Sequence, residues 1–145
     1  MSTIGIINGA NLNLLGQREP HVYGYRTIDE LQQYLEEEAK RLDVNLLFFQ
    51  SNIEGELVNQ IQQWWLNKKV DGIIINPGGY AHTSLVIRDA IASIDIPVFE
   101  VHLSNPFHRE AIRQQLITAS ACKAVISGLG FDSYIAAIYA MCKQL

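Results

Sequence analysis

The chain has 145 residues, of which 48% are hydrophobic, which is enough apolar material for one domain spanning residues 1–145 with a single core. Its formal net charge of −4 argues against binding to nucleic acid or to an acidic membrane, because both require a basic face. No segment approaches the roughly 20 apolar residues of a membrane span, and the first residues lack the pattern of a cleaved leader, so we expect a cytoplasmic protein. The two cysteines, Cys122 and Cys142, stand alone and are expected to be reduced and buried.

Short β-branched runs alternate along the chain with longer segments of helical period. In chain order, we predict a strand at 4–7, a helix at 28–42 with Thr27 as its N-cap, a strand at 44–49, a helix at 53–67, a strand at 72–75, a helix at 84–92, a strand at 97–101, a less regular helix at 109–116, a strand at 124–126 and a helix at 131–143. The strands are nearly continuous in apolar residues, which is typical of a parallel sheet covered on both faces. This pattern predicts an α/β three-layer sandwich of flavodoxin-like type, with a five-stranded parallel sheet in the order 2-1-3-4-5.

Three polar loops follow the first, third and fourth predicted strands, at residues 8–24, 76–84 and 102–110. In such sheets ligands bind beyond the carboxyl ends of the strands, so we expect these loops to meet around a ligand. Although the whole chain is acidic, the loops and the residues just beyond them hold all four histidines and three of the six arginines, namely His21, His82, His102, His108, Arg18, Arg109 and Arg113. The five lysines lie elsewhere, so the pattern predicts a local anion pocket without a Schiff-base lysine.

Other kinds of site fit these loops less well. The chain has neither the GxxxxGK[ST] phosphate loop nor the GxGxxG dinucleotide motif, and Asn76 stands where a phospho-receiver domain needs aspartate. A Ser-His-Asp hydrolase could be drawn from Ser84, His82 and Asp89, but the GxSxG motif is missing. A metal site could be drawn from His82, His102 and a carboxylate, but no HxH or HExxH spacing supports it. We therefore expect no metal and no cofactor, and we keep a non-catalytic anion-binding module as the alternative to an enzyme.

Three motifs together resemble the type II 3-dehydroquinate dehydratases. They are Asn-Gly-Ala-Asn-Leu-Asn-Leu-Leu-Gly-Gln-Arg-Glu-Pro at 8–20, Asn-Pro-Gly-Gly-Tyr-Ala-His-Thr-Ser at 76–84 and Glu-Val-His-Leu-Ser-Asn at 100–105. The resemblance extends over essentially the whole chain. It implies a flavodoxin-like fold, a homododecamer, and dehydration of 3-dehydroquinate to 3-dehydroshikimate without a cofactor, by trans elimination through an enolate.

The resemblance also implies catalytic roles. Tyr23 would be the base, and Arg18, five residues earlier, would favour its phenolate. Because tyrosine has an ordinary pKa of about 10, lowering that pKa by two units would take roughly 2.7 kcal/mol of preferential stabilisation of the phenolate. His102 would protonate the leaving hydroxyl, Glu100 would orient His102 or a water, and Asn11 would hold the polar network around the enolate.

The remaining matches imply substrate contacts from Asn76, His82, Leu103, Ser104 and Arg113, and a contact of Asp89 with the site of a neighbouring subunit. Ala10 and Ser133 depart from the residues that are frequent in the family, proline and glycine respectively, and neither is a proposed reacting group. Gly16 and Gly24 near the two ends of the segment 15–25 suggest that it could move as a lid. The sequence leaves open whether the pathway is shikimate biosynthesis or quinate breakdown, since both use this reaction.

Overall fold

The computed structural model describes residues 1–23 and 25–145, and the side chain of Tyr23 lies outside this description. Five parallel strands form one sheet in the order β2-β1-β3-β4-β5. The strands are β1 (Thr3–Asn8), β2 (Asn45–Gln50), β3 (Gly72–Asn76), β4 (Val98–His102) and β5 (Ala124–Ser127). The flavodoxin-like fold and strand order that the sequence predicted are therefore confirmed.

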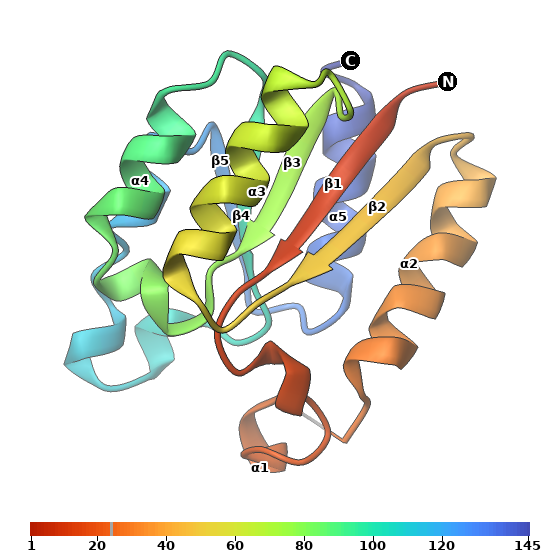
Figure 1. Cartoon of the computed structure of the whole chain (residues 1–145). Coiled ribbons are helices and arrows are strands. Elements are labelled where there is room, and N and C mark those ends of the chain that lie inside the picture. Colours follow the sequence, from red (N-terminus) through yellow and green to blue (C-terminus); the bar gives the residue numbers. More distant parts are fainter. Residues whose placement is uncertain (24) are drawn as a thin grey trace.

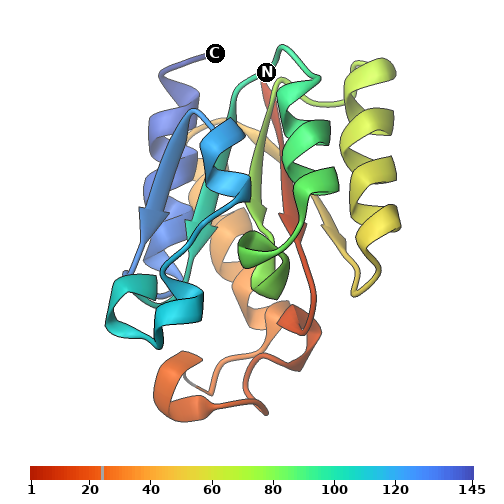
Figure 2. The same ribbon diagram turned by 90° about the vertical axis from the view of Figure 1, so that its left-hand side faces the viewer.

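Helices cover both faces of this sheet (Figures 1 and 2). On one face lie α2 (Ile28–Arg41) and α5 (Asp132–Cys142), and on the other lie α3 (Glu54–Leu66) and α4 (Leu85–Ala92). Each face has its own apolar cluster, because successive side chains of a strand point to opposite faces of the sheet. No helix in the described ranges is both long and apolar enough to cross a membrane.

Two helices, α2 and α4, begin with a side-chain N-cap, and the sequence predicted the one at Thr27. The Thr27 hydroxyl oxygen accepts a hydrogen bond from the Glu30 backbone N–H at 3.2 Å, which satisfies one of the free donors at the start of α2. Ser84 does the same for α4 by accepting from the Ile87 backbone N–H at 3.0 Å. Since Ser84 Oγ is committed to this cap and the residue is buried, the hydrolase reading of Ser84 finds no support.

Three expectations were wrong in detail: the helix at 109–116, the burial of the two edge strands and the burial of the two cysteines. Residues 109–116 form no α-helix, and only short 3-10 turns occur between β4 and β5, at Pro106–His108, Ala111–Arg113 and Thr118–Ala121. Ile112 is 73% exposed, so this stretch lacks the buried apolar face that stabilises a longer helix. The edge strands β2 and β5 are only partly buried, and both cysteines are free and partly buried.

The loops after β1 and β3 touch backbone to backbone, and this contact builds one side of the site. The Gly9 N–H donates to the Asn76 carbonyl oxygen at 2.8 Å. A Cβ on Gly9 would lie 2.2 Å from the Pro77 oxygen, and one on Gly78 would lie 2.6 Å from the Ala10 oxygen. Gly78 also has a φ of +64°, so two glycines are needed for this approach.

Candidate active site

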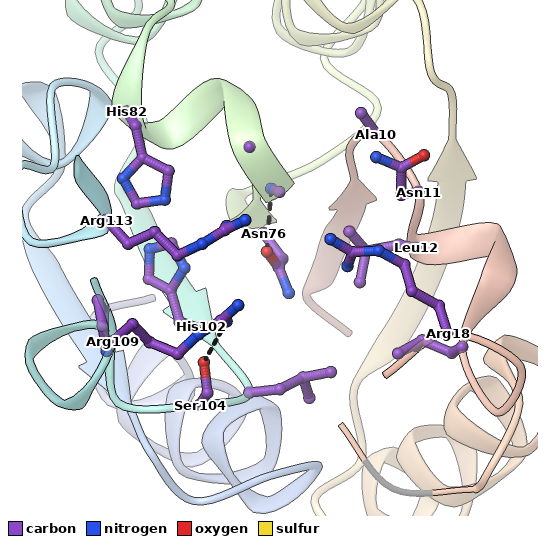
Figure 3. Close-up of a pocket in the computed structure, with 15 residues that line it drawn as sticks. Ala10, Asn11, Leu12, Arg18, Asn76, His82, His102, Ser104, Arg109 and Arg113 are labelled. Atoms are coloured by element: carbon purple, nitrogen blue, oxygen red, sulfur yellow. Dashed lines mark hydrogen bonds between the residues drawn. The ribbon is translucent and has the colours of Figure 1, made fainter. Parts of the chain in front are cut away.

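The carboxyl ends of β1, β3 and β4 open into a cavity of about 160 Å³ (Figure 3). All strands point toward this end of the molecule, where the short helix α1 (Pro20–Tyr23) and the 3-10 turns Pro106–His108 and Ala111–Arg113 also lie (Figures 1 and 2). The cavity is lined by Ala10, Asn11, Leu12, Leu15, Arg18, Asn76, Gly78, Gly79, His82, His102, Leu103, Ser104, Pro106, Arg109 and Arg113. Its walls thus come from the three loops in which the sequence analysis placed the ligand.

Cationic side chains face one another across this cavity (Figure 3). Arg18 reaches in from the loop after β1, while Arg109 and Arg113 reach in from the opposite wall. His82 stands beside Arg113, and its Nδ1 lies 2.9 Å from the Gln115 carbonyl oxygen, which orients the ring. An anionic ligand would therefore meet positive charge on two sides despite the negative net charge of the chain.

His102 and Glu100 form a buried pair at the end of β4. The His102 Nε2 atom lies 2.7 Å from Glu100 Oε2, and Glu100 has no solvent-exposed surface. The Thr118 hydroxyl donates to the other carboxylate oxygen of Glu100, Oε1. This second hydrogen bond holds the carboxylate in place, so Glu100 in turn fixes the orientation of the imidazole whose other side faces the cavity.

A second buried network holds the ends of β1 and β3 together. The Tyr134 hydroxyl, on α5, donates to Asn8 Oδ1 at 2.6 Å and accepts from Asn76 Nδ2 at 3.0 Å. Asn76 Oδ1 accepts from the Gly78 N–H at 3.1 Å. Burial raises the pKa of Tyr134 far above its usual value, so this hydroxyl stays protonated and serves as a structural link.

Replacing Tyr134 by phenylalanine should lower the free energy of unfolding by about 1–3 kcal/mol, because two buried amide groups would lose their partner. Urea unfolding should show a lower midpoint with an unchanged m-value. Tyr139→Phe is the matched control, since Tyr139 lies on the same helix and is 54% exposed, and it should stay within about 0.5 kcal/mol of the parent protein. Equal stability of the two variants would contradict the structural role of the Tyr134 hydroxyl.

Glu19 connects the loop after β1 with the opposite wall of the cavity. Its Oε2 atom lies 3.5 Å from a guanidinium nitrogen of Arg18 and 3.8 Å from one of Arg109. Asn11, nearer the start of the loop, adopts a φ of +70°, and its N–H donates to Asn52 Oδ1 at 2.9 Å. The hydrogen bond to Asn52 thus fixes the loop near Asn11, and the ion pair of Glu19 links the loop to Arg109.

Most of the predicted site residues meet at this cavity. Its lining includes Asn11, Arg18, Asn76, His82, His102, Leu103, Ser104 and Arg113. Glu100 lies behind His102 and does not line it. Asp89 is exposed on α4, with its carboxylate 3.1 Å from Arg88, and the side chain of Tyr23 lies outside the described residues. His21 and His108 are exposed and do not line the cavity.

The structure adds Thr118 and Tyr134 to the site, and it places Arg109, which the sequence analysis named only as one cation of the anion pocket, in the cavity wall. Arg109 lines the cavity and contacts Ser104 Oγ at 3.4 Å; its position among the clustered arginines was the signal for it. Thr118 and Tyr134 act from outside the three loops, so the motifs gave no signal for them. Within residues 1–23 and 25–145, no group of three or more His, Cys, Asp or Glu side chains is placed to hold a metal ion.

A cation-lined cavity with a carboxylate-backed histidine, at the carboxyl edge of a parallel sheet, defines a flavodoxin-like α/β enzyme that acts on a small anion. The sequence model of the family described as dehydroquinase class II matches residues 2–142. The chain therefore belongs to the class II dehydroquinase family, and it is a hydro-lyase.

Individual relatives support this assignment. The chain is 48% identical over 141 residues to a 3-dehydroquinate dehydratase of Caldicellulosiruptor saccharolyticus, with 97% of both chains covered. It is 48% identical over 129 residues to catabolic 3-dehydroquinase 1 of Fusarium vanettenii, covering 89% of this chain and 88% of the relative. The crystal structure of the type II dehydroquinase from Butyrivibrio crossotus matches with a TM-score of 0.94 and 41% identity, over 97% of both chains.

Proposed function

We propose that the chain converts 3-dehydroquinate to 3-dehydroshikimate by trans elimination of water through an enolate. One observation carries the proposal: His102, backed by buried Glu100, opens into a cavity that has arginines on two opposing sides. The substrate is an anionic hydroxylated cyclohexane carboxylate with a ketone. Its carboxylate can pair with the arginines, and its leaving hydroxyl can take a proton from His102. The class II dehydroquinase relatives support the same reaction.

In the proposed mechanism, Tyr23 acts first, as a phenolate base favoured by Arg18. It removes the proton on the carbon next to the ketone, and the electron pair of that C–H bond moves into the carbonyl to form the enolate. Asn11 takes part in the polar network around this enolate. When the ketone re-forms, the hydroxyl is expelled from the carbon β to the ketone, which is the neighbour of the deprotonated carbon. This hydroxyl takes a proton from His102 and leaves as water.

The substrate contacts in this proposal follow the cavity wall. Arg113 pairs with the carboxylate or the hydroxyls, and Asn76 and His82 bind polar groups of the ring. The backbone of Leu103 and Ser104, together with the Ser104 hydroxyl, provides further hydrogen bonds. Because Leu12 and Leu15 cover one side, the ligand is partly withdrawn from water, and this strengthens the charged contacts.

We further propose a homododecamer in which Asp89 reaches the site of a neighbouring subunit. The position of Asp89 supports the contact with a neighbouring subunit, because the residue is exposed on α4 and does not line the cavity of its own chain. Light scattering of the purified protein tests the assembly. A fully active monomer would refute the shared site.

The test of the reaction is the ultraviolet absorbance of the conjugated enone that forms when purified protein is mixed with 3-dehydroquinate. No lysine lines the cavity in the described part of the chain, so borohydride added with substrate should leave the enzyme active. Saturable binding without product would instead favour the non-catalytic binding module. The reaction serves both shikimate biosynthesis and quinate breakdown, and neighbouring genes would distinguish these pathways.

Arg18→Ala tests the cation that is proposed to favour the phenolate. Without the guanidinium, ionisation of the base needs a higher pH, so the limb of the kcat/KM profile that reports the phenolate should move upward by about one to two pH units. At neutral pH the rate should fall by roughly 10- to 100-fold. An unchanged profile with unchanged activity would contradict this role. Arg41→Ala is the matched control, because Arg41 lies on the surface of α2 and pairs with Glu38.

A further inference from the structure

The segment 17–25 carries Arg18 and Glu19, and its two ends lie next to each other. Gly16 has a φ of +88°, and a Cβ built on it would lie 2.6 Å from the Tyr25 carbonyl oxygen and 3.3 Å from that of Arg26. The two ends of the segment therefore touch backbone to backbone. On the incoming side, Leu15 is buried in the apolar cluster under α2 and α5 and fixes that end.

The outgoing end is fixed by Arg26 on an aromatic platform. The central guanidinium carbon of Arg26 lies 4.0 Å from the centroid of the Phe131 ring and 5.3 Å from that of Tyr34. Both distances are within the range of a cation–π interaction. Arg26 is thus held against α2, which carries Tyr34, and against the N-terminus of α5, which Phe131 precedes.

This platform packs against the same apolar cluster as the cavity wall. Phe131 is only 3% exposed and belongs to the same apolar cluster as Leu15 and Leu103, which both line the cavity. The Tyr34 hydroxyl donates to Asp132 Oδ1 at 2.6 Å, which fixes the ring. The same hydrogen bond raises the pKa of Tyr34, so its ring stays neutral.

We propose that Arg26 is a positioning residue for the reaction: by binding to Phe131 and Tyr34, it fixes the end of the segment 17–25 and so holds Arg18 in the cavity wall. Arg26 does not line the cavity and acts through the backbone contact at Gly16 and Tyr25. The link to catalysis rests on the proposed function, but the link to the position of the segment does not.

The experiment compares Arg26→Ala and Arg26→Lys with the control Arg41→Ala. Trypsin cleavage of the folded protein after Arg18 is followed by the mass of the fragment 1–18, since cleavage of a native segment measures how often it opens. Arg26→Ala should be cleaved there about fivefold faster, in proportion to one exposed cation–π contact, and Arg26→Lys should restore part of the protection. Arg41→Ala should behave like the parent protein.

Steady-state kinetics and urea unfolding complete the test. In Arg26→Ala, kcat/KM should fall by up to about fivefold, while the urea midpoint should fall only by the small amount that one exposed cation–π contact contributes. Unchanged cleavage after Arg18, or faster cleavage with unchanged kcat/KM, would overturn the positioning role. So would a lowered urea midpoint with faster cleavage throughout the chain, since that indicates general destabilisation. If the parent protein does not turn over 3-dehydroquinate, the proposed function fails, whereas the cleavage rates still decide whether Arg26 holds the segment.

Discussion

Replacing Tyr23 by phenylalanine is expected to lower kcat by roughly 10²- to 10⁴-fold, the usual contribution of a general base. Phenylalanine keeps the ring but has no oxygen to take the proton next to the ketone, so the enolate cannot form at a useful rate. Substrate binding should change by less than about threefold, because the charged contacts of the opposite wall remain. Enone formation at saturating substrate measures kcat, and calorimetric titration measures binding.

The matched control is Tyr25→Phe. Tyr25 lies two residues further along the same segment and is 80% exposed, so its hydroxyl has no place in the cavity. Its variant should retain the activity of the parent protein. Full activity in Tyr23→Phe would remove Tyr23 as the base and would turn attention to the other groups that line the cavity.

The fold was predictable because parallel sheets leave a strong pattern in sequence. The central strands β1, β3 and β4 are buried almost throughout, and their apolar runs are nearly continuous, with Glu100 as the interruption in β4. Helices α2 and α4 were found to within a residue or two, since each has an apolar stripe and a capping hydroxyl. The predicted helix at 109–116 was wrong, because a composition that favours a helix does not stabilise one without a buried apolar face, and Ile112 is exposed.

The walls of the site were predictable for a topological reason. Loops that follow adjacent parallel strands must emerge at one edge, so His82, His102 and Arg18 could be expected to meet. The residues that support them could not be found in this way. Tyr134 and Thr118 lie far along the chain from Asn8 and Glu100, and only the folded backbone brings their hydroxyls within reach. The role of Tyr23 came from the resemblance and remains a prediction.

The second large effect is expected at His102. His102→Ala should lower kcat by roughly 10²- to 10⁴-fold, because the leaving hydroxyl would lose its proton donor. Glu100→Gln should lower kcat by about 10- to 100-fold, since a neutral amide cannot stabilise the imidazolium as a carboxylate does. Glutamine has nearly the same shape as glutamate, and its side-chain oxygen can still accept from the Thr118 hydroxyl. Glu38→Gln on the surface of α2 is the control and should be without effect.

The double variant separates two ways in which Glu100 could act. If Glu100 works only by orienting and stabilising His102, across the 2.7 Å that joins their atoms, removing it has no further cost once the imidazole is gone. The double variant should then have the kcat of His102→Ala to within about threefold, a strongly non-additive result. If Glu100 instead orients a water that acts separately from the imidazole, the two effects multiply. Because Glu100 is fully buried and already bonded to Thr118 and His102, we expect the non-additive result.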